Sequence, residues 1–194
     1  PMITIGQNPI LWHLMQIYLK QGFREFIIAT GYKHEIIDKW VEHNNQIDGW
    51  GYSCNVKAFY TGTESLTGER IRKIIKDHAA EKYFVTYGDG LANINLNKLL
   101  EFHSSMHTVV TVTSVRPPAR FGLIESKNGL VTHFGEKNQS DAGWINGGFF
   151  VMDRRVLDYI PMTNVPFETE PVNQLVKDQQ LSTYTHDGFW QPMD

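Results

Sequence analysis

An aspartate between two glycines follows one of the most apolar stretches of the chain. Residues 83–87 read Tyr-Phe-Val-Thr-Tyr, and Gly88-Asp89-Gly90 comes directly after them. If this stretch is a buried strand, Asp89 lies at its carboxyl end, the edge at which open α/β sheets bind ligands. A carboxylate there suits Mg²⁺ shared with phosphate groups, and the glycines let a ligand approach the backbone. The plain alternative is a turn, which Gly-Asp-Gly forms easily.

A second candidate is the hydroxyl-rich segment from Thr61 to Arg70, which reads TGTESLTGER. We expect it to join a strand to a helix, so that its backbone N–H groups and the helix N-terminus can receive an anion or the edge of a base. The alternative is an ordinary helix start with Thr67 as its cap and Arg70 in solvent. No Gly-Lys-Ser/Thr follows, which excludes a phosphate-binding loop of the Walker type.

Two more segments carry polar groups beside predicted strands. Glu136 could accept hydrogen bonds from sugar hydroxyls, and Lys137 could bind a phosphate. The alternative is that this adjacent acid and base are solvated surface residues, as such pairs more often are. Residues 143–151 read GWINGGFFV, where Asn146 could bind sugar hydroxyls. Glycine within a strand often marks the close approach of a ligand, and the alternative here is a bulge or hairpin turn.

Residues 167–171 (FETEP) and 186–194 (HDGFWQPMD) complete the set. The first predicts a helix start with Glu in its first turn. The second predicts a loop of aromatic and polar residues that ends in Asp194. Asp89 and Asp194 could meet on one metal ion, but their spacing alone cannot show that they do.

The elements that must position these groups alternate over residues 1–115. We expect strands at 26–30, 52–60, 83–87 and 108–115, and helices at 9–19 with Asn8 as cap, 34–41, 68–78 and 94–102. This is the α/β pattern of a mostly parallel sheet with helices on both faces. The remainder predicts strands at 121–124, 129–134 and 144–152 with short helices at 154–160 and 170–177, an antiparallel or mixed extension. Residues 42–51 are polar and predict a loop.

The amino-acid composition indicates what class of protein this is. The 194 residues are 41% hydrophobic and 20% charged, which is typical of one soluble globular domain. A net charge of −3 leaves no broad basic field for nucleic acid or an acidic membrane. One cysteine, Cys54, cannot form a disulfide within its own chain, which fits a reducing compartment. With no apolar run of about 18 residues and no signal segment, we expect a cytoplasmic protein.

These segments resemble, together and in this order, the sugar-1-phosphate nucleotidyltransferases, and among them the glucose-1-phosphate cytidylyltransferases. The resemblance runs essentially end to end. Its most specific pieces are TGTESLTGER, TYGDG (86–90), RPPARFG (116–122), the pair Glu136-Lys137, GWINGGFFV and HDGFWQPMD. It implies a Rossmann-like nucleotidyltransferase (GT-A-like) fold in one catalytic domain over residues 1–194.

The resemblance also implies a reaction, in which CTP and α-D-glucose 1-phosphate give CDP-glucose and pyrophosphate. Asp89 and Asp194 would bind Mg²⁺, and Lys137 would hold the sugar phosphate. The remaining implied contacts are Thr67 and Gly68 near the base with Arg70 supporting that loop, Gly88 near the ribose, and Glu136, Asn146 and the Gly147 backbone at the sugar. A homo-oligomer is also implied, with residues 42–51 as a plausible contact region.

The family begins with a Gly-rich signature and a lysine that lie ahead of Pro1, and it continues past Asp194 with a helical tail. We therefore expect a chain truncated at both ends, with little or no activity by itself. Two alternatives stay open. One is another base or sugar, as in a thymidylyl- or uridylyltransferase; the other is a non-catalytic module that binds nucleotide sugars.

Overall fold

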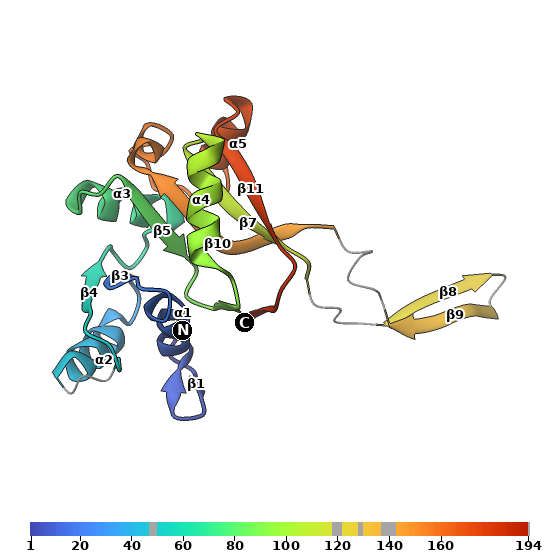
Figure 1. The fold of residues 1–194 in the computed structure, drawn as a ribbon, viewed down its shortest axis with the longest axis horizontal. Coiled ribbons are helices and arrows are strands. Elements are labelled where there is room, and N and C mark those ends of the chain that lie inside the picture. Colours follow the sequence, from blue (N-terminus) through green and yellow to red (C-terminus); the bar gives the residue numbers. More distant parts are fainter. Residues whose placement is uncertain (47–49, 118–121, 128–129, 137–142, 194) are drawn as a thin grey trace.

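The computed structural model describes residues 1–46, 50–117, 122–127, 130–136 and 143–193 (Figure 1). Strands and helices alternate through most of the chain. The strands are β1 (Thr4–Ile5), β2 (Asn8–Pro9), β3 (Glu25–Thr30), β4 (Asn55–Tyr60), β5 (Lys82–Thr86), β6 (Gly90–Ala92), β7 (Val110–Val115), β8 (Gly122–Lys127), β9 (Leu130–Glu136), β10 (Ile145–Asp153), β11 (Leu181–His186) and β12 (Trp190–Pro192). The helices are α1 (Ile10–Leu19), α2 (His34–Gln46), α3 (Thr67–Asp77), α4 (Leu96–Met106), the 3₁₀ helix η2 (Arg154–Asp158) and α5 (Glu170–Lys177).

The centre of the molecule is a four-stranded sheet with the order β11-β7-β10-β5. Strand β11 runs parallel to β7, while β10 runs antiparallel to both β7 and β5. Strands β3 and β4 form a separate parallel pair. The predicted α/β class is therefore confirmed, with a mixed central sheet that contains both parallel and antiparallel pairings.

Strand β10 shows why the sheet is covered on both faces. Its buried side chains alternate with a period of two, as a strand requires. Phe150 and Met152 pack with residues of α3, η2 and α5, whereas Phe149 and Val151 pack with residues of α1 and α4. Figure 1 shows α4 lying across the sheet. The prediction of helices on both faces is confirmed.

The first part of the chain has a smaller core of its own. Leu11, Met15 and Leu19 lie on one side of α1 and pack with residues of α2 and β4. Two predictions here were wrong. Asn8 does not cap α1, because it pairs with Ile5 and the N-cap is Pro9, without a side-chain hydrogen bond. The predicted loop 42–51 is helical as far as Gln46, since α2 continues through it.

Two short pairings connect distant parts of the sequence. Strand β12 pairs antiparallel with β6, so that Pro192 lies opposite Gly90. Strands β8 and β9 pair with each other, and Figure 1 shows this hairpin extending away from the four-stranded sheet. Among the helices of the described ranges, none has the length and apolar character needed to cross a membrane.

Candidate active site

Asp89 lies just beyond the carboxyl end of β5 and directly before β6. It is exposed, so its carboxylate can reach a ligand. The backbone N–H of Met193 donates to the carbonyl oxygen of Asp89 at 2.7 Å, which extends the pairing of β12 with β6. Residues 190–193, which precede Asp194, are thereby fixed beside Asp89. Asp194 itself lies outside the described residues.

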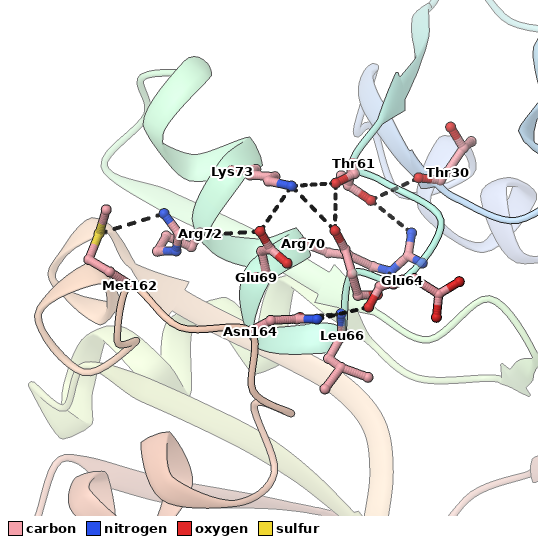
Figure 2. A network of polar contacts seen from close by, with 11 residues as sticks. Thr30, Thr61, Glu64, Leu66, Glu69, Arg70, Arg72, Lys73, Met162 and Asn164 are labelled. Carbon is pink, nitrogen blue, oxygen red and sulfur yellow. Dashed lines mark hydrogen bonds and ion pairs between the residues drawn. The ribbon is translucent and has the colours of Figure 1, made fainter.

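The segment from Thr61 to Arg70 is held from two sides (Figure 2). On one side, the N–H and the hydroxyl of Thr61 both donate to the carbonyl of Thr30, at 2.9 and 2.8 Å. On the other, the amide of Asn164 accepts from the N–H of Leu66 at 2.8 Å and donates to the carbonyl of Glu64 at 2.9 Å. Hydrogen bonds on both sides thus fix the conformation of this loop.

Arg70 stabilises this loop from inside. Its guanidinium donates to the carbonyl of Ser65 and to the hydroxyl of Thr61, both at 2.8 Å. A Cβ on Gly31 would lie 2.4 Å from the Arg70 guanidinium, so the group packs directly on that glycine. The alternative that placed Arg70 in solvent was wrong.

Lys73 and Glu69 add an ion pair to the same network. The Lys73 ammonium lies 3.0 Å from the Glu69 carboxylate and donates to the carbonyl of Thr61 at 2.5 Å. The hydrogen bond from Lys73 lowers the pKa of Glu69. The cationic groups of Arg70 and Lys73 both therefore form hydrogen bonds within the protein.

Three glycines of the candidate segments are required by packing. A Cβ on Gly68 would lie 2.6 Å from the carbonyl oxygen of Val165, which also accepts from the Gly68 N–H at 3.1 Å. A Cβ on Gly147 would lie 2.7 Å from the Val115 side chain, and one on Gly148 would lie 2.7 Å from the Tyr87 ring. Gly148 also has a φ of +76° at an irregularity in the pairing of β10 with β7. The bulge that was the alternative explanation of this segment is present.

A chain of side-chain hydrogen bonds joins three candidate segments. The hydroxyls of Thr67 and Tyr87 donate to the two oxygens of Glu168, at 2.6 and 2.5 Å. The amide nitrogen of Asn146 donates to the Tyr87 hydroxyl at 3.2 Å. Thr67 does not cap α3, whose N-cap is Leu66 without a side-chain bond. Instead its hydroxyl accepts from the N–H of Phe167 at 2.8 Å.

The Tyr87 hydroxyl is held protonated by its surroundings. Burial of the ring, followed by the hydrogen bond and the negative charge of Glu168, raises the pKa of Tyr87 above its ordinary value. The ring also packs edge-on against Phe150 with centroids 5.7 Å apart. Tyr87 is therefore a fixed hydrogen-bond donor rather than an acid or a base at neutral pH.

The remaining predicted site residues are Gly88, Arg70, Glu136 and Lys137. Gly88 and Arg70 line a cavity of about 1040 Å³ whose walls are mainly apolar side chains of α1, β3, α3 and β5. Glu136 is the last residue of β9, on the hairpin that extends from the sheet, and nothing of its side chain is described. Lys137 lies outside the described residues. The structure thus brings Thr67, Asn146 and Gly147 into one connected region.

Comparisons with known proteins show the family to which the chain belongs. A family model described as "Nucleotidyl transferase" matches residues 1–192. The chain belongs to the nucleotidyl transferase family. It is 40% identical over 211 residues to a probable glucose-1-phosphate cytidylyltransferase of Bacillus subtilis (strain 168), covering 100% of this chain and 82% of that protein.

Two further proteins extend the comparison. A glucose-1-phosphate cytidylyltransferase of Salmonella typhimurium is 35% identical over 217 residues, again with 100% and 82% coverage. The crystal structure of HddC from Yersinia pseudotuberculosis matches with a TM-score of 0.73 at 22% identity, covering 99% of this chain and 83% of that one. That structure supports the fold alone, and the nucleotidyltransferase fold predicted from the sequence is confirmed.

Nucleotidyl transferases typically use a divalent metal ion, and Asp89 of this transferase fits such an ion. Its carboxylate is exposed just beyond the carboxyl end of β5, an outer strand of the four-stranded sheet, and next to the β6–β12 pairing. Within the described ranges no three His, Cys, Asp or Glu side chains gather. Mg²⁺ does not require such a group, because it usually takes one or two carboxylates and completes its shell with water and phosphate oxygens.

Sequence reasoning missed two residues of this transferase's candidate site. Tyr87 was treated as the end of a strand and Glu168 as part of a helix start. Their positions did carry a signal: Tyr87 directly precedes the Gly-Asp-Gly turn, and Glu168 precedes a helix with Pro at its start. Nothing in the spacing, however, indicated that the two side chains meet.

Proposed function

We propose that this nucleotidyl transferase moves a cytidylyl group from CTP to α-D-glucose 1-phosphate, giving CDP-glucose and pyrophosphate. The identity of 35–40% to glucose-1-phosphate cytidylyltransferases over the whole chain carries this proposal. The family supports the transfer of a nucleotidyl group to a sugar 1-phosphate. The identity of the base, cytosine, and of the sugar, glucose, is what we propose in addition. We also propose that residues 1–194 belong to one catalytic domain.

In this proposal the nucleotide and the sugar phosphate occupy opposite ends of the Thr67–Glu168–Tyr87–Asn146 chain. Thr67 and Gly68 lie near the base on the loop that Arg70 stabilises, and Gly88 lies near the ribose. Asn146, Gly147 and Glu136 take the sugar, and Lys137 takes its phosphate. The hydrogen-bonded connection between Thr67 and Asn146 supports this division, because it joins the two regions within one network.

The chemistry needs no nucleophile from the protein. The sugar phosphate oxygen attacks the α-phosphorus of the nucleoside triphosphate in line, the bond to the β-phosphate breaks, and pyrophosphate leaves. The chain's own contribution is to align the two substrates and to neutralise charge, effects that account for most phosphoryl-transfer catalysis. Bound Mg²⁺, held by Asp89 and Asp194, would supply positive charge at the phosphate oxygens.

The exposed position of Asp89 also argues against the non-catalytic alternative. Its carboxylate is exposed, and no described residue forms a hydrogen bond or an ion pair with it, so structural stabilisation does not explain the acid. A pure binding module would have less need of a carboxylate there. The thymidylyl- and uridylyltransferase alternatives are tested by the experiment that follows, which supplies dTTP and UTP beside CTP.

The test is pyrophosphate release by the complete gene product with Mg²⁺ and glucose 1-phosphate. CTP, dTTP, UTP and ATP are supplied one at a time. Release with CTP alone supports the proposal. Release with dTTP or UTP but not CTP would replace the base assignment, and tight nucleotide-sugar binding without release from any of the four would favour the binding module.

A further inference from the structure

Glu168 lies at the midpoint of a hydrogen-bonded chain whose two ends are backbone N–H groups. At one end the N–H of Phe167 donates to the Thr67 hydroxyl at 2.8 Å. At the other, the N–H of Gly148 donates to Oδ1 of Asn146 at 2.8 Å. Between them, Thr67 and Asn146 connect to Glu168 directly and through Tyr87.

The direction of every bond in this chain follows from chemistry. A backbone N–H can only donate and an ionised carboxylate can only accept. The Thr67 hydroxyl must therefore donate a hydrogen bond to Glu168 and accept one from the backbone N–H of Phe167. The Tyr87 hydroxyl likewise donates a hydrogen bond to Glu168. The lone pairs of the Tyr87 oxygen are then available to accept from the amide nitrogen of Asn146. The Asn146 amide has its oxygen at Gly148 and its nitrogen at Tyr87.

This orientation decides what Asn146 can offer a ligand. Asn146 is exposed, and its amide nitrogen carries two N–H groups, of which Tyr87 accepts one. The nitrogen side of the amide can therefore present a donor. A sugar hydroxyl that meets this side binds through its oxygen, as an acceptor.

We propose that Glu168 is a positioning residue for the sugar phosphate. By accepting the hydrogen bond from the Tyr87 hydroxyl, it fixes the Asn146 amide with an N–H group available to a sugar hydroxyl oxygen. The proposal rests on the proposed function, because it takes Asn146 as a sugar contact. Glu168 touches neither substrate in this account and acts through Tyr87. Its second oxygen holds Thr67, so the same carboxylate fixes the loop near the base.

Glutamine at position 168 tests the direction of the bonds rather than the size of the side chain. Its amide has one acceptor and one donor, so one of the two hydroxyls must meet an N–H group. If that hydroxyl is Tyr87, its proton turns toward the Asn146 nitrogen, which is also a donor. The chain then contains two opposed donors and cannot keep its geometry.

The kinetic experiment compares four variants of the complete gene product with wild type. Glu168→Gln and Tyr87→Phe are each expected to raise the KM for the sugar phosphate about tenfold, the effect of losing one good hydrogen bond. Their kcat values stay within about threefold, because the reacting phosphates are not touched. Thr67→Val breaks the other arm and leaves the KM for the sugar phosphate within about twofold. Glu170 is an exposed acid in the first turn of α5, and Glu170→Gln is the matched control, expected to behave as wild type.

The double variant Tyr87→Phe/Glu168→Gln adds a test of connection. If both residues act through Asn146, the double variant raises the KM for the sugar phosphate no further than the worse single variant. Additive effects would overturn the proposal. So would equal increases in the KM values for nucleotide and sugar phosphate with every variant, since that is the outcome of general damage.

A measurement without substrate separates this proposal from the proposed function. The side-chain amide of Asn146, labelled with ¹⁵N and assigned through Asn146→Asp, gives an NMR signal that reports its hydrogen bonds. Glu168→Gln and Tyr87→Phe are expected to move this signal, and Glu170→Gln to leave it in place. An unmoved signal in both variants would overturn the positioning role even in an active enzyme. A wild-type protein that releases no pyrophosphate would instead overturn the function, while the signal still tests the chain.

Discussion

The backbone N–H of Met193 donates to the carbonyl of Asp89 at 2.7 Å, although the two residues lie far apart along the chain. This bond continues the antiparallel pairing of β12 with β6. It fixes the segment that precedes Asp194 beside the aspartate that follows β5. The proposal that both carboxylates serve one metal ion is supported by this relationship.

The β6–β12 pairing is expected to depend on Trp190. The Trp190 ring packs against the core of α1 and α4, and its indole N–H donates to the carbonyl of Gly147 at 2.8 Å. Trp190→Ala is expected to lower the free energy of unfolding by about 2–4 kcal/mol, since a large partly buried side chain and a hydrogen bond are lost. Urea unfolding measures this, with Phe189→Ala, an exposed neighbour, as control. Equal effects of the two substitutions would contradict the role given to Trp190.

Gly68 is expected to tolerate no side chain. A methyl group there would lie 2.6 Å from the Val165 carbonyl, and backbone cannot move aside cheaply. Gly68→Ala should therefore destabilise the protein by about 1–3 kcal/mol, and should raise the KM for the nucleotide because the loop shifts. Gly143→Ala, where a Cβ has nothing within 4 Å, is the control in thermal unfolding and in kinetics. A Gly68→Ala protein as stable as the control would refute this packing.

Arg70 is expected to resist replacement by lysine. Its guanidinium donates in two directions, to Ser65 and Thr61, and a lysine ammonium lacks that planar fork. Arg70→Lys should raise the KM for the nucleotide about tenfold with a smaller effect on the KM for the sugar phosphate. The reverse substitution at an exposed position, Lys20→Arg, serves as control. An unchanged nucleotide KM would show that the loop does not need the fork.

Asp153 is expected to make stability depend on acid pH. Burial opposes its charge, but hydrogen bonds from Arg155 at 2.6 Å and from His103 at 3.1 Å outweigh burial and lower its pKa. Because the pKa of the folded state is the lower one, the stabilisation is complete above the ordinary value near 3.8 and is lost as pH falls below it.

The variant Asp153→Asn tests this dependence. Its free energy of unfolding should be about 1–3 kcal/mol below that of wild type at pH 7, and the difference should shrink below about pH 4. Asp158→Asn, at an exposed site, should show neither effect. A deficit that stays constant from pH 7 to pH 3 would mean that the charge of Asp153 contributes nothing.

Local pattern was enough to predict many of the elements. The helix predicted at 170–177 has those bounds, and the strand predicted at 144–152 is observed as β10 at Ile145–Asp153. The end of α2 was missed because its polar residues 42–46 resemble a loop. The cap of α1 was missed because Asn8 is used in pairing with Ile5 instead.

The candidate site was predictable by segment but not by contact. Asp89, Thr67 and Asn146 stood out through the glycines and hydroxyls around them. The bonds that join them depend on Glu168, which lies 101 positions from Thr67 and 81 from Tyr87. No periodicity or spacing connects positions so distant, since their meeting follows only from how the sheet and the 160–169 segment pack.

Formation of a nucleotide sugar from CTP and glucose 1-phosphate, followed by ³¹P NMR, tests the central claim most directly. The complete gene product with Mg²⁺ should give the diphosphate signals of CDP-glucose together with pyrophosphate. Asp89→Ala, whose exposed side chain can be removed without harming the core, should lower the rate about a hundredfold or more while leaving thermal stability unchanged. Full activity in Asp89→Ala, or no product from any nucleoside triphosphate in wild type, would contradict the account.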